Sequence, residues 1–107
     1  MASSKKPTLT LKQLIEINDS IKALPGLLAS LKGQEAQMER LEAVLDADPL
    51  NSVAESMWDS EYQSYMLTIN RMLGILCKVP TIDPPTARTI IFGHRDEFER
   101  LVSRIAV

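Results

Sequence analysis

The chain has 107 residues, of which 45% are hydrophobic and 24% are charged. These values predict a single folded domain and exclude a chain that is disordered throughout. The single cysteine excludes an internal disulfide and fits a reducing, cytoplasmic location, and no apolar stretch approaches the roughly 20 residues of a membrane-spanning helix.

Charge is distributed unevenly along the chain, although the formal net charge is only −2. Residues 34–62 carry eight carboxylates and one arginine, whereas residues 1–33 and 63–107 are both net basic. This acidic segment is interpreted either as the solvated end of a helical hairpin or as a surface complementary to a basic protein partner. A sequence pI near 5.3 argues against direct binding of nucleic acid.

The N-terminal part of the chain predicts a tail followed by a helix. Residues 1–7 contain two lysines and no apolar run, which is typical of a flexible tail rather than a signal peptide. A first helix is predicted from Thr10, because Thr10 and Gln13 have the spacing of a capping box. Pro25 predicts a kink or a split near Leu24, since a proline removes a backbone hydrogen bond and clashes with the preceding helical turn.

Two long helices are predicted in the middle of the chain. Each is indicated by a row of residues separated by alternating steps of three and four, which is the spacing that lines one side of a helix. The short connection between the rows predicts antiparallel neighbours. The first row comprises Leu24, Leu27, Leu31, Gln34, Met38, Leu41 and Leu45, and the second comprises Trp58, Tyr62, Tyr65, Ile69, Met72, Leu76 and Val79.

The boundaries of the second long helix are less sharply indicated. Two start signals compete, because Asp48 precedes Pro49 while Ser52 and Glu55 have the spacing of a capping box. The apolar pattern continues to about Lys78, which corresponds to a helix of about 40 to 45 Å at 1.5 Å per residue.

The C-terminal part of the chain predicts a connector and a final helix. Residues 79–85 contain three prolines and predict an extended connector, in which Asp83 caps a helix that begins at Pro84. The β-prone run 89–92 and Gly93 indicate a strand or a break. One continuous helix is favoured, because a third row passes through this run in register: Ala87, Ile91, His94, Phe98, Leu101 and Ile105.

These elements predict an all-α fold, an antiparallel helical bundle of three long helices with coiled-coil-like contacts, formed by residues 8–107 as one domain. The bundle would have four helices if the chain turns fully at Pro25. Apolar residues outside the rows add more surface than three thin helices can bury, which predicts a homo-oligomer or a protein partner. These additional residues are Leu28, Val44, Met57, Met66, Leu73, Ile90 and Val102.

No combination of residues predicts catalysis, a bound metal or a cofactor. His94 is the only histidine, and its place in the third row favours a core or interface residue over a catalytic base. Cys77 is interpreted as a small buried apolar residue. Two pairs of carboxylates lie four residues apart, Glu35 with Glu39 and Glu55 with Asp59, but neither is accompanied by the Glu-x-x-His motif of metal-binding bundles.

Trp58, Tyr62 and Tyr65 form an aromatic stripe within the acidic segment. Core packing is the commonest role of such a stripe, and a binding hot spot is the second, because Trp and Tyr dominate hot spots. The surrounding negative charge disfavours stacking on nucleic-acid bases. The residues that we expect to contact a protein partner are Glu39, Glu42, Glu55, Trp58, Asp59 and Tyr62.

The sequence therefore predicts a non-catalytic protein-interaction module. Its concrete form is a small adaptor or chaperone, or an inhibitor of a larger complex such as a phage-encoded one. The alternative is a self-assembling structural subunit of a larger particle, because the apolar surplus could pair with copies of the same chain. An enzyme is the third hypothesis, and it would depend on His94.

Overall fold

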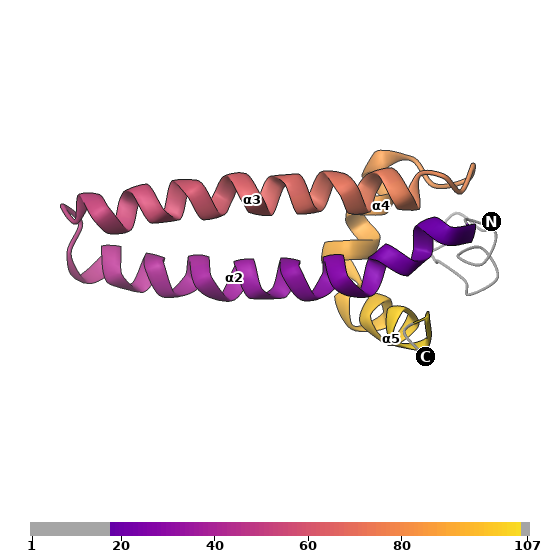
Figure 1. Ribbon diagram of the computed structural model, residues 1–107, viewed down its shortest axis with the longest axis horizontal. Helices are drawn as coiled ribbons and strands as arrows, with labels where there is room; N and C mark the ends of the chain where they lie inside the picture. The colour runs from indigo at the N-terminus through magenta and orange to yellow at the C-terminus, as the bar shows by residue number, and fades with distance from the viewer. Residues whose placement is uncertain (1–17, 106–107) are drawn as a thin grey trace, which may run out of the picture. The chain divides into compact units, whose positions relative to one another are not determined.

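The computed structural model describes residues 18–105, and every regular element in this range is a helix. The all-α prediction is thereby confirmed for the described part of the chain. No helix in that part is long and apolar enough to cross a membrane. In chain order the elements are the 3-10 helix η1 (Asn18–Ala23), α2 (Leu24–Ala47), α3 (Ser52–Leu76), α4 (Pro84–Arg88), the π-helix η2 (Thr89–Gly93) and α5 (Arg95–Ile105) (Figure 1).

The chain divides into two compact units. The first, which we call the hairpin unit, is Gly26–Arg71, and the second, which we call the C-terminal unit, joins residues 72–107 to residues up to Pro25. The predicted tail at residues 1–7 and the predicted capping box at Thr10 lie outside the described residues. The arrangement as one three-helix bundle stays a prediction.

The predicted break at Pro25 is confirmed. The 3-10 helix η1 ends at Ala23 and α2 begins at Leu24, so that Pro25 lies in the first turn of α2. A proline is tolerated there because the first backbone N–H groups of a helix have no partner within the helix. The far end of α2 is Ala47, close to the predicted end at Leu45.

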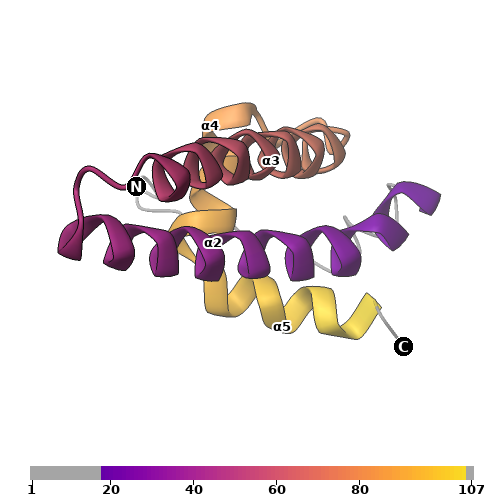
Figure 2. The ribbon, with the colours of Figure 1, turned by 60° about the vertical axis from the view of Figure 1, so that its left-hand side comes forward.

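The hairpin unit consists of parts of α2 and α3 that run antiparallel, side by side, around the turn 48–51 (Figures 1 and 2). Leu31, Leu41 and Ile69 are buried, as their rows predict. Thr68 is buried as well, and its hydroxyl donates to the backbone carbonyl of Ser64 at 3.0 Å, which satisfies its polar group inside the hairpin.

The helix α3 is capped by a residue that neither predicted start signal contains. The side-chain oxygen of Asn51 accepts a hydrogen bond from the backbone N–H of Ala54 at 3.0 Å, and its carbonyl accepts from the N–H of Glu55 at 3.1 Å. This is the geometry of an N-cap, so Ser52 is the first helical residue rather than the cap. Asp48 instead lies in the turn, where its carbonyl accepts from the N–H of Asn51 at 3.1 Å.

The segment between α3 and α4 is not the extended connector that its prolines predict. It forms tight turns, in which the N–H of Val79 donates to the carbonyl of Leu76 at 3.1 Å and the N–H of Ile82 donates to the carbonyl of Val79 at 3.0 Å. Val79 and Ile82 are buried, so the connector contributes two apolar side chains to the core of the C-terminal unit.

The predicted cap at Asp83 is confirmed. Its carboxylate accepts a hydrogen bond from the backbone N–H of Thr86 at 2.9 Å, ahead of a first turn that contains proline. Hydrogen bonds from the side chain and the backbone of Thr86 favour the charged form of this carboxylate, so the pKa of Asp83 is lowered from its ordinary value.

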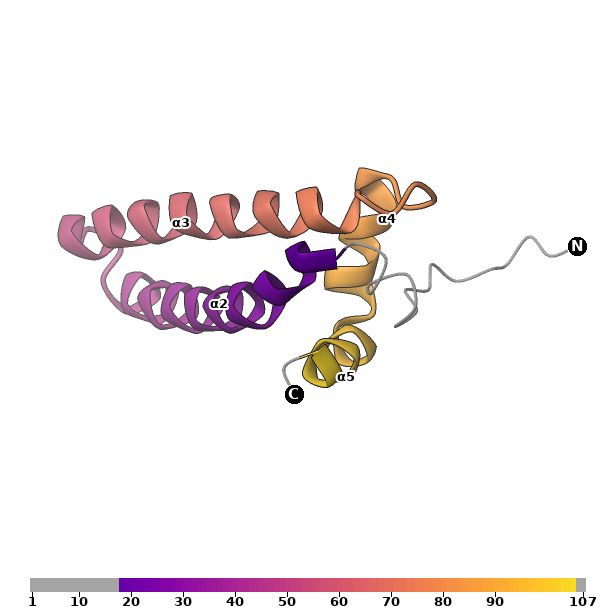
Figure 3. The same ribbon diagram turned by 45° about the vertical axis from the view of Figure 1, so that its right-hand side comes forward.

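The prediction of one continuous final helix is wrong. The chain forms the short α4, the π-helix η2 and then α5, and it changes direction before α5 (Figure 3). His94 lies between η2 and α5, with φ of −130° and ψ of 45°. The N–H of His94 donates to the carbonyl of Thr89 at 3.1 Å, five residues back, as in a widened turn. The side-chain Nε of Arg95 donates to the carbonyl of Ile91 at 2.7 Å and satisfies a group that a continuing α-helix would have bonded through its backbone.

The predicted surplus of apolar surface is only partly present. Four of the residues assigned to it are buried, whereas Val44 and Met57 are exposed and Met66 is half-buried. The widened turn at η2 buries two consecutive isoleucines, which a single narrow row does not anticipate. The four buried residues are Leu28, Leu73, Ile90 and Val102.

Candidate functional site

Two hydrogen bonds join α2 to α3 inside the hairpin unit. The indole Nε1 of Trp58 donates to a carboxylate oxygen of Glu42 at 3.1 Å, and the hydroxyl of Tyr65 donates to a carboxylate oxygen of Glu35 at 3.4 Å. The two bonds are seven residues apart on each helix, so both lie on the same side of the hairpin. They bring acidic side chains of α2 against aromatic side chains of α3.

The aromatic side chains on this side of α3 are ordered against one another. The rings of Trp58 and Tyr62 are stacked, with centroids 5.2 Å apart and an interplanar angle of 8°. Tyr62 and Tyr65 follow with centroids 6.5 Å apart and an angle of 40°. Tyr62 is exposed while Trp58 and Tyr65 are half-buried, so the stripe is partly core and partly surface.

A shallow open groove of about 380 Å³ runs beside this stripe. Three carboxylates surround it, and the thioether of Met38 and the ring of Tyr65 give it an apolar part. A side chain with an apolar stem and a cationic head fits this combination, because the stem contacts the apolar part while the head meets the carboxylates. The groove is lined by Glu35, Met38, Glu39, Glu42 and Tyr65.

We call this surface the acidic–aromatic face and define it by Glu35, Glu39, Glu42, Trp58, Tyr62 and Tyr65. Of the residues predicted to contact a partner, Glu39, Glu42, Trp58 and Tyr62 belong to it. Glu55 and Asp59 are exposed on α3, and helical spacing places them beside Tyr62 rather than in the groove.

Glu35, Met38 and Tyr65 line the groove but are not among the residues predicted to contact a partner. A signal for two of them was available. Glu35 precedes Glu42 by seven residues and Tyr65 follows Trp58 by seven, so each repeats the position of a residue that was selected. Met38 belongs to the row that packs α2, and nothing in the sequence distinguishes it from its neighbours in that row.

Metal binding has no support in the described part of the chain, where no three His, Cys, Asp or Glu side chains are grouped closely enough to hold an ion. Cys77 has a free thiol and is half-buried rather than buried, which corrects its interpretation as a core residue. It lies in the turns that follow α3.

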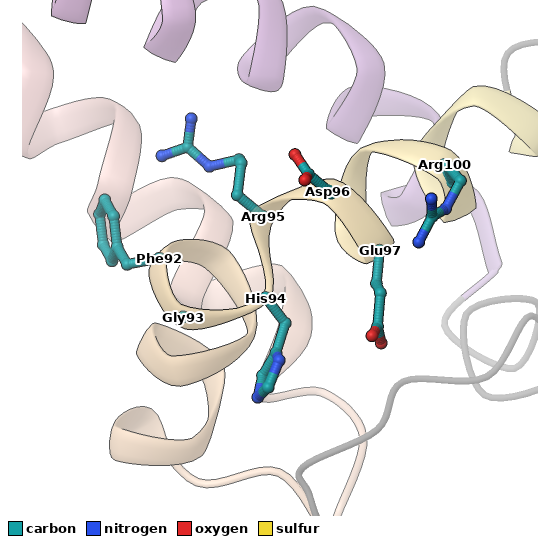
Figure 4. Close-up of a pocket in the computed structure, with 7 residues that line it drawn as sticks. All are labelled: Phe92, Gly93, His94, Arg95, Asp96, Glu97 and Arg100. Carbon is teal, nitrogen blue, oxygen red and sulfur yellow. The ribbon is translucent and has the colours of Figure 1, made fainter.

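A second open cavity, of about 410 Å³, lies at the start of α5 in the C-terminal unit. His94 lines it and is half-buried, so it does not occupy the core position that its row predicts. In Figure 4, His94 and Glu97 project to one side of the chain while Arg95 and Asp96 project to the other. The residues that line the cavity carry both signs of charge: Phe92, Gly93, His94, Arg95, Asp96, Glu97 and Arg100.

Comparison of the chain with models of protein families, with curated proteins and with solved structures gave no match. The candidate site is therefore defined by its own geometry and charge.

Proposed function

We propose that this protein is a non-catalytic interaction module that binds a basic segment of a larger protein through the acidic–aromatic face. The observation that carries the proposal is the pair of hydrogen bonds from Trp58 to Glu42 and from Tyr65 to Glu35. These bonds hold two carboxylates and two aromatic rings in place before any partner arrives, which lowers the entropy lost on binding.

The chemistry of the face suits arginine and lysine. Carboxylates bind guanidinium and ammonium groups through charge-assisted hydrogen bonds, and tyrosine and tryptophan rings attract the same cations through their faces. The remaining exposed carboxylates of the hairpin unit, which include Glu55 and Asp59, would speed the approach of a basic partner at low salt. An adaptor, a chaperone or an inhibitor in the cytoplasm would each use such a face.

Trp58 provides the assay, because it is the only tryptophan of the chain and belongs to the face. A helical peptide with arginines along one side should change the fluorescence of Trp58 on binding, and the affinity should fall as salt is added. A peptide of the same length with glutamines in place of the arginines should not bind.

Two variants test the assignment to this face. Glu39→Lys reverses a charge of the groove and is expected to weaken binding of the arginine peptide by roughly tenfold or more. Glu97→Lys, at an exposed glutamate of α5, is the matched control and should leave the affinity within about twofold. Equal binding of the arginine and glutamine peptides, or equal loss in both variants, would overturn the proposal.

A structural subunit that assembles from copies of itself is a second candidate, because large apolar side chains of α3 such as Val53 and Leu67 are exposed. Light scattering distinguishes the two. A particle of many copies would favour the structural subunit, whereas a monomer or dimer that binds the arginine peptide would favour the interaction module.

A further inference from the structure

A second row of residues lies along α3, and in contrast to the row that packs against α2 it is exposed. Its members follow steps of four and three, the spacing of a coiled-coil contact. The exposed fractions of Val53, Met57 and Leu67 are 68%, 48% and 61%. We call this the outer row of α3 and define it by Val53, Met57, Ser60, Ser64, Leu67 and Arg71, all of them in the hairpin unit.

The outer row is uncharged as far as Arg71, in an otherwise charge-rich segment. The positions beside it on one flank, Ser56, Gln63 and Asn70, are uncharged as well. At 3.6 residues per turn, Glu55 and Asp59 lie roughly 120° or more around the helix from it, whereas the half-buried Glu61 lies at its other edge, four residues after Met57 and three before Ser64. The centres of protein interfaces are depleted of charged residues in the same way, so the composition of this face is that of a contact surface.

We propose that the outer row is an interface for a second copy of this chain, in which the two α3 helices pack antiparallel about a two-fold axis. The outer row is complementary to itself when its direction is reversed. Met57 of one copy meets Leu67 of the other, and Ser60 meets Ser64, so large residues contact at the ends and small ones at the centre, where the helices cross most closely.

Charge favours the antiparallel arrangement over the parallel one. A parallel pair would place Arg71 against Arg71, whereas the antiparallel pair brings each Arg71 to the hairpin end of the other copy. Asp46 and Asp48 are exposed at that end. Opposite charges at both ends of the contact therefore stabilise the antiparallel pair, whereas two facing arginines destabilise the parallel pair.

The dimer leaves the acidic–aromatic face open. Trp58 and Tyr62 lie roughly 100° to 180° around α3 from the outer row, since successive residues of a helix are separated by about 100°. A dimer would therefore present two such faces, and a partner with two basic segments would gain avidity from binding both.

The test is the mass of the full chain in solution, measured by sedimentation equilibrium over a wide range of concentration. The expected result is a concentration-dependent change from the 11.9 kDa chain to a species of twice that mass. Met57→Glu and Leu67→Lys, each at an exposed position, should each raise the dissociation constant of the dimer by roughly tenfold or more. Ala43→Glu, at an exposed position of α2, is the matched control and should leave the constant unchanged.

The double variant Met57→Glu with Leu67→Lys tests the register. In the antiparallel pair each new glutamate meets a new lysine of the other copy, so the double variant should recover the dimer that both single variants lose. Circular dichroism establishes that each variant keeps its helices. A wild-type chain that stays monomeric, or a dimer that survives the single substitutions, would overturn the proposal, and a double variant as weak as the single ones would overturn the antiparallel register.

Discussion

The two units of the chain differ in how much of their apolar surface they bury. Among the described residues, eleven buried apolar side chains belong to the C-terminal unit and five belong to the hairpin unit, although the described parts of the two units are of similar length. In the C-terminal unit, a connector, a π-helix and several short helical segments enclose Ile82, Ile91 and Phe98. Two antiparallel helices can bury only one stripe each, and the rest of their surface stays in contact with solvent. The comparison indicates that one unit supplies stability while the other supplies surface.

The largest expected difference between the units is in the free energy of unfolding that is lost when one leucine of each unit is replaced by alanine. Leu76→Ala, at a side chain with 0% exposure, should lower the free energy of unfolding by about 4 kcal/mol, because a cavity opens in enclosed surroundings. Leu41→Ala, at 7% exposure in the hairpin unit, should cost about 2 kcal/mol, because its neighbours can relax toward solvent. Urea unfolding followed by circular dichroism measures both. Equal costs, or a larger cost at Leu41, would contradict the comparison.

The packing of the hairpin unit contains a defect that can be repaired. The side-chain oxygen of Gln34 is buried and has no hydrogen-bond partner within the described structure. Gln34→Leu should raise the free energy of unfolding by about 1 kcal/mol, because it removes an unsatisfied polar group from the row that packs α2. Gln37→Leu, at a half-buried position three residues later, is the control and should have a smaller effect. A loss of stability in Gln34→Leu would mean that the oxygen has a partner in solution.

Removal of the N-cap of α3 is expected to have a smaller effect on the free energy of unfolding. Asn51→Ala removes the oxygen that accepts from the N–H of Ala54, and it should lower the free energy of unfolding by about 1 kcal/mol or slightly less. Ser52→Ala should change it far less, since Ser52 lies inside the helix. If Ser52→Ala lowered the free energy of unfolding in urea more than Asn51→Ala, Ser52 would be the cap, as the predicted capping box requires.

The smallest effect is expected at Asp83, and it depends on pH. Because the pKa of Asp83 is lowered on folding, its contribution to stability is complete above its ordinary pKa of 3.8 and is lost as the pH falls through the lower folded value. Asp83→Asn keeps a capping oxygen but does not titrate. The free energy of unfolding of the wild type, relative to that of Asp83→Asn, should therefore be constant from pH 6 to 7 and fall as the pH approaches 3. A difference that is constant over the whole range would contradict the charged cap.

The hairpin unit could be predicted from the sequence better than the C-terminal unit, and the reason is physical. Each long helix has one row of apolar residues at regular spacing, so its length and its buried side follow directly from the pattern. In the C-terminal unit Ile90 and Ile91 are consecutive and both buried, and the widened turn that contains them has no distinct spacing in the sequence. The break at His94 is accompanied by a hydrogen bond from the side chain of Arg95 to the carbonyl of Ile91, four residues back, and an individual side-chain contact of this kind leaves no mark on the apolar spacing.

The candidate site shows the same division. Acidic and aromatic residues could be selected from the sequence, because their types and local charge indicate binding. Which of them meet was not predictable, since that depends on how far each helix extends on either side of the turn. The cap at Asn51 sets this offset by fixing where α3 begins, and neither of the two predicted start signals included that residue.

The two helices contact each other along their length, at Glu42 with Trp58 and at Glu35 with Tyr65, and not only through the turn 48–51 that connects them. The turn can therefore accept foreign sequence. A flexible insert between Pro49 and Leu50 would lengthen a closed loop, and each doubling of loop length costs only about 0.6 kcal/mol. Leu50 is 91% exposed and has no packing to lose. A fluorescent tag or an epitope could be carried at this position while the helices keep their alignment.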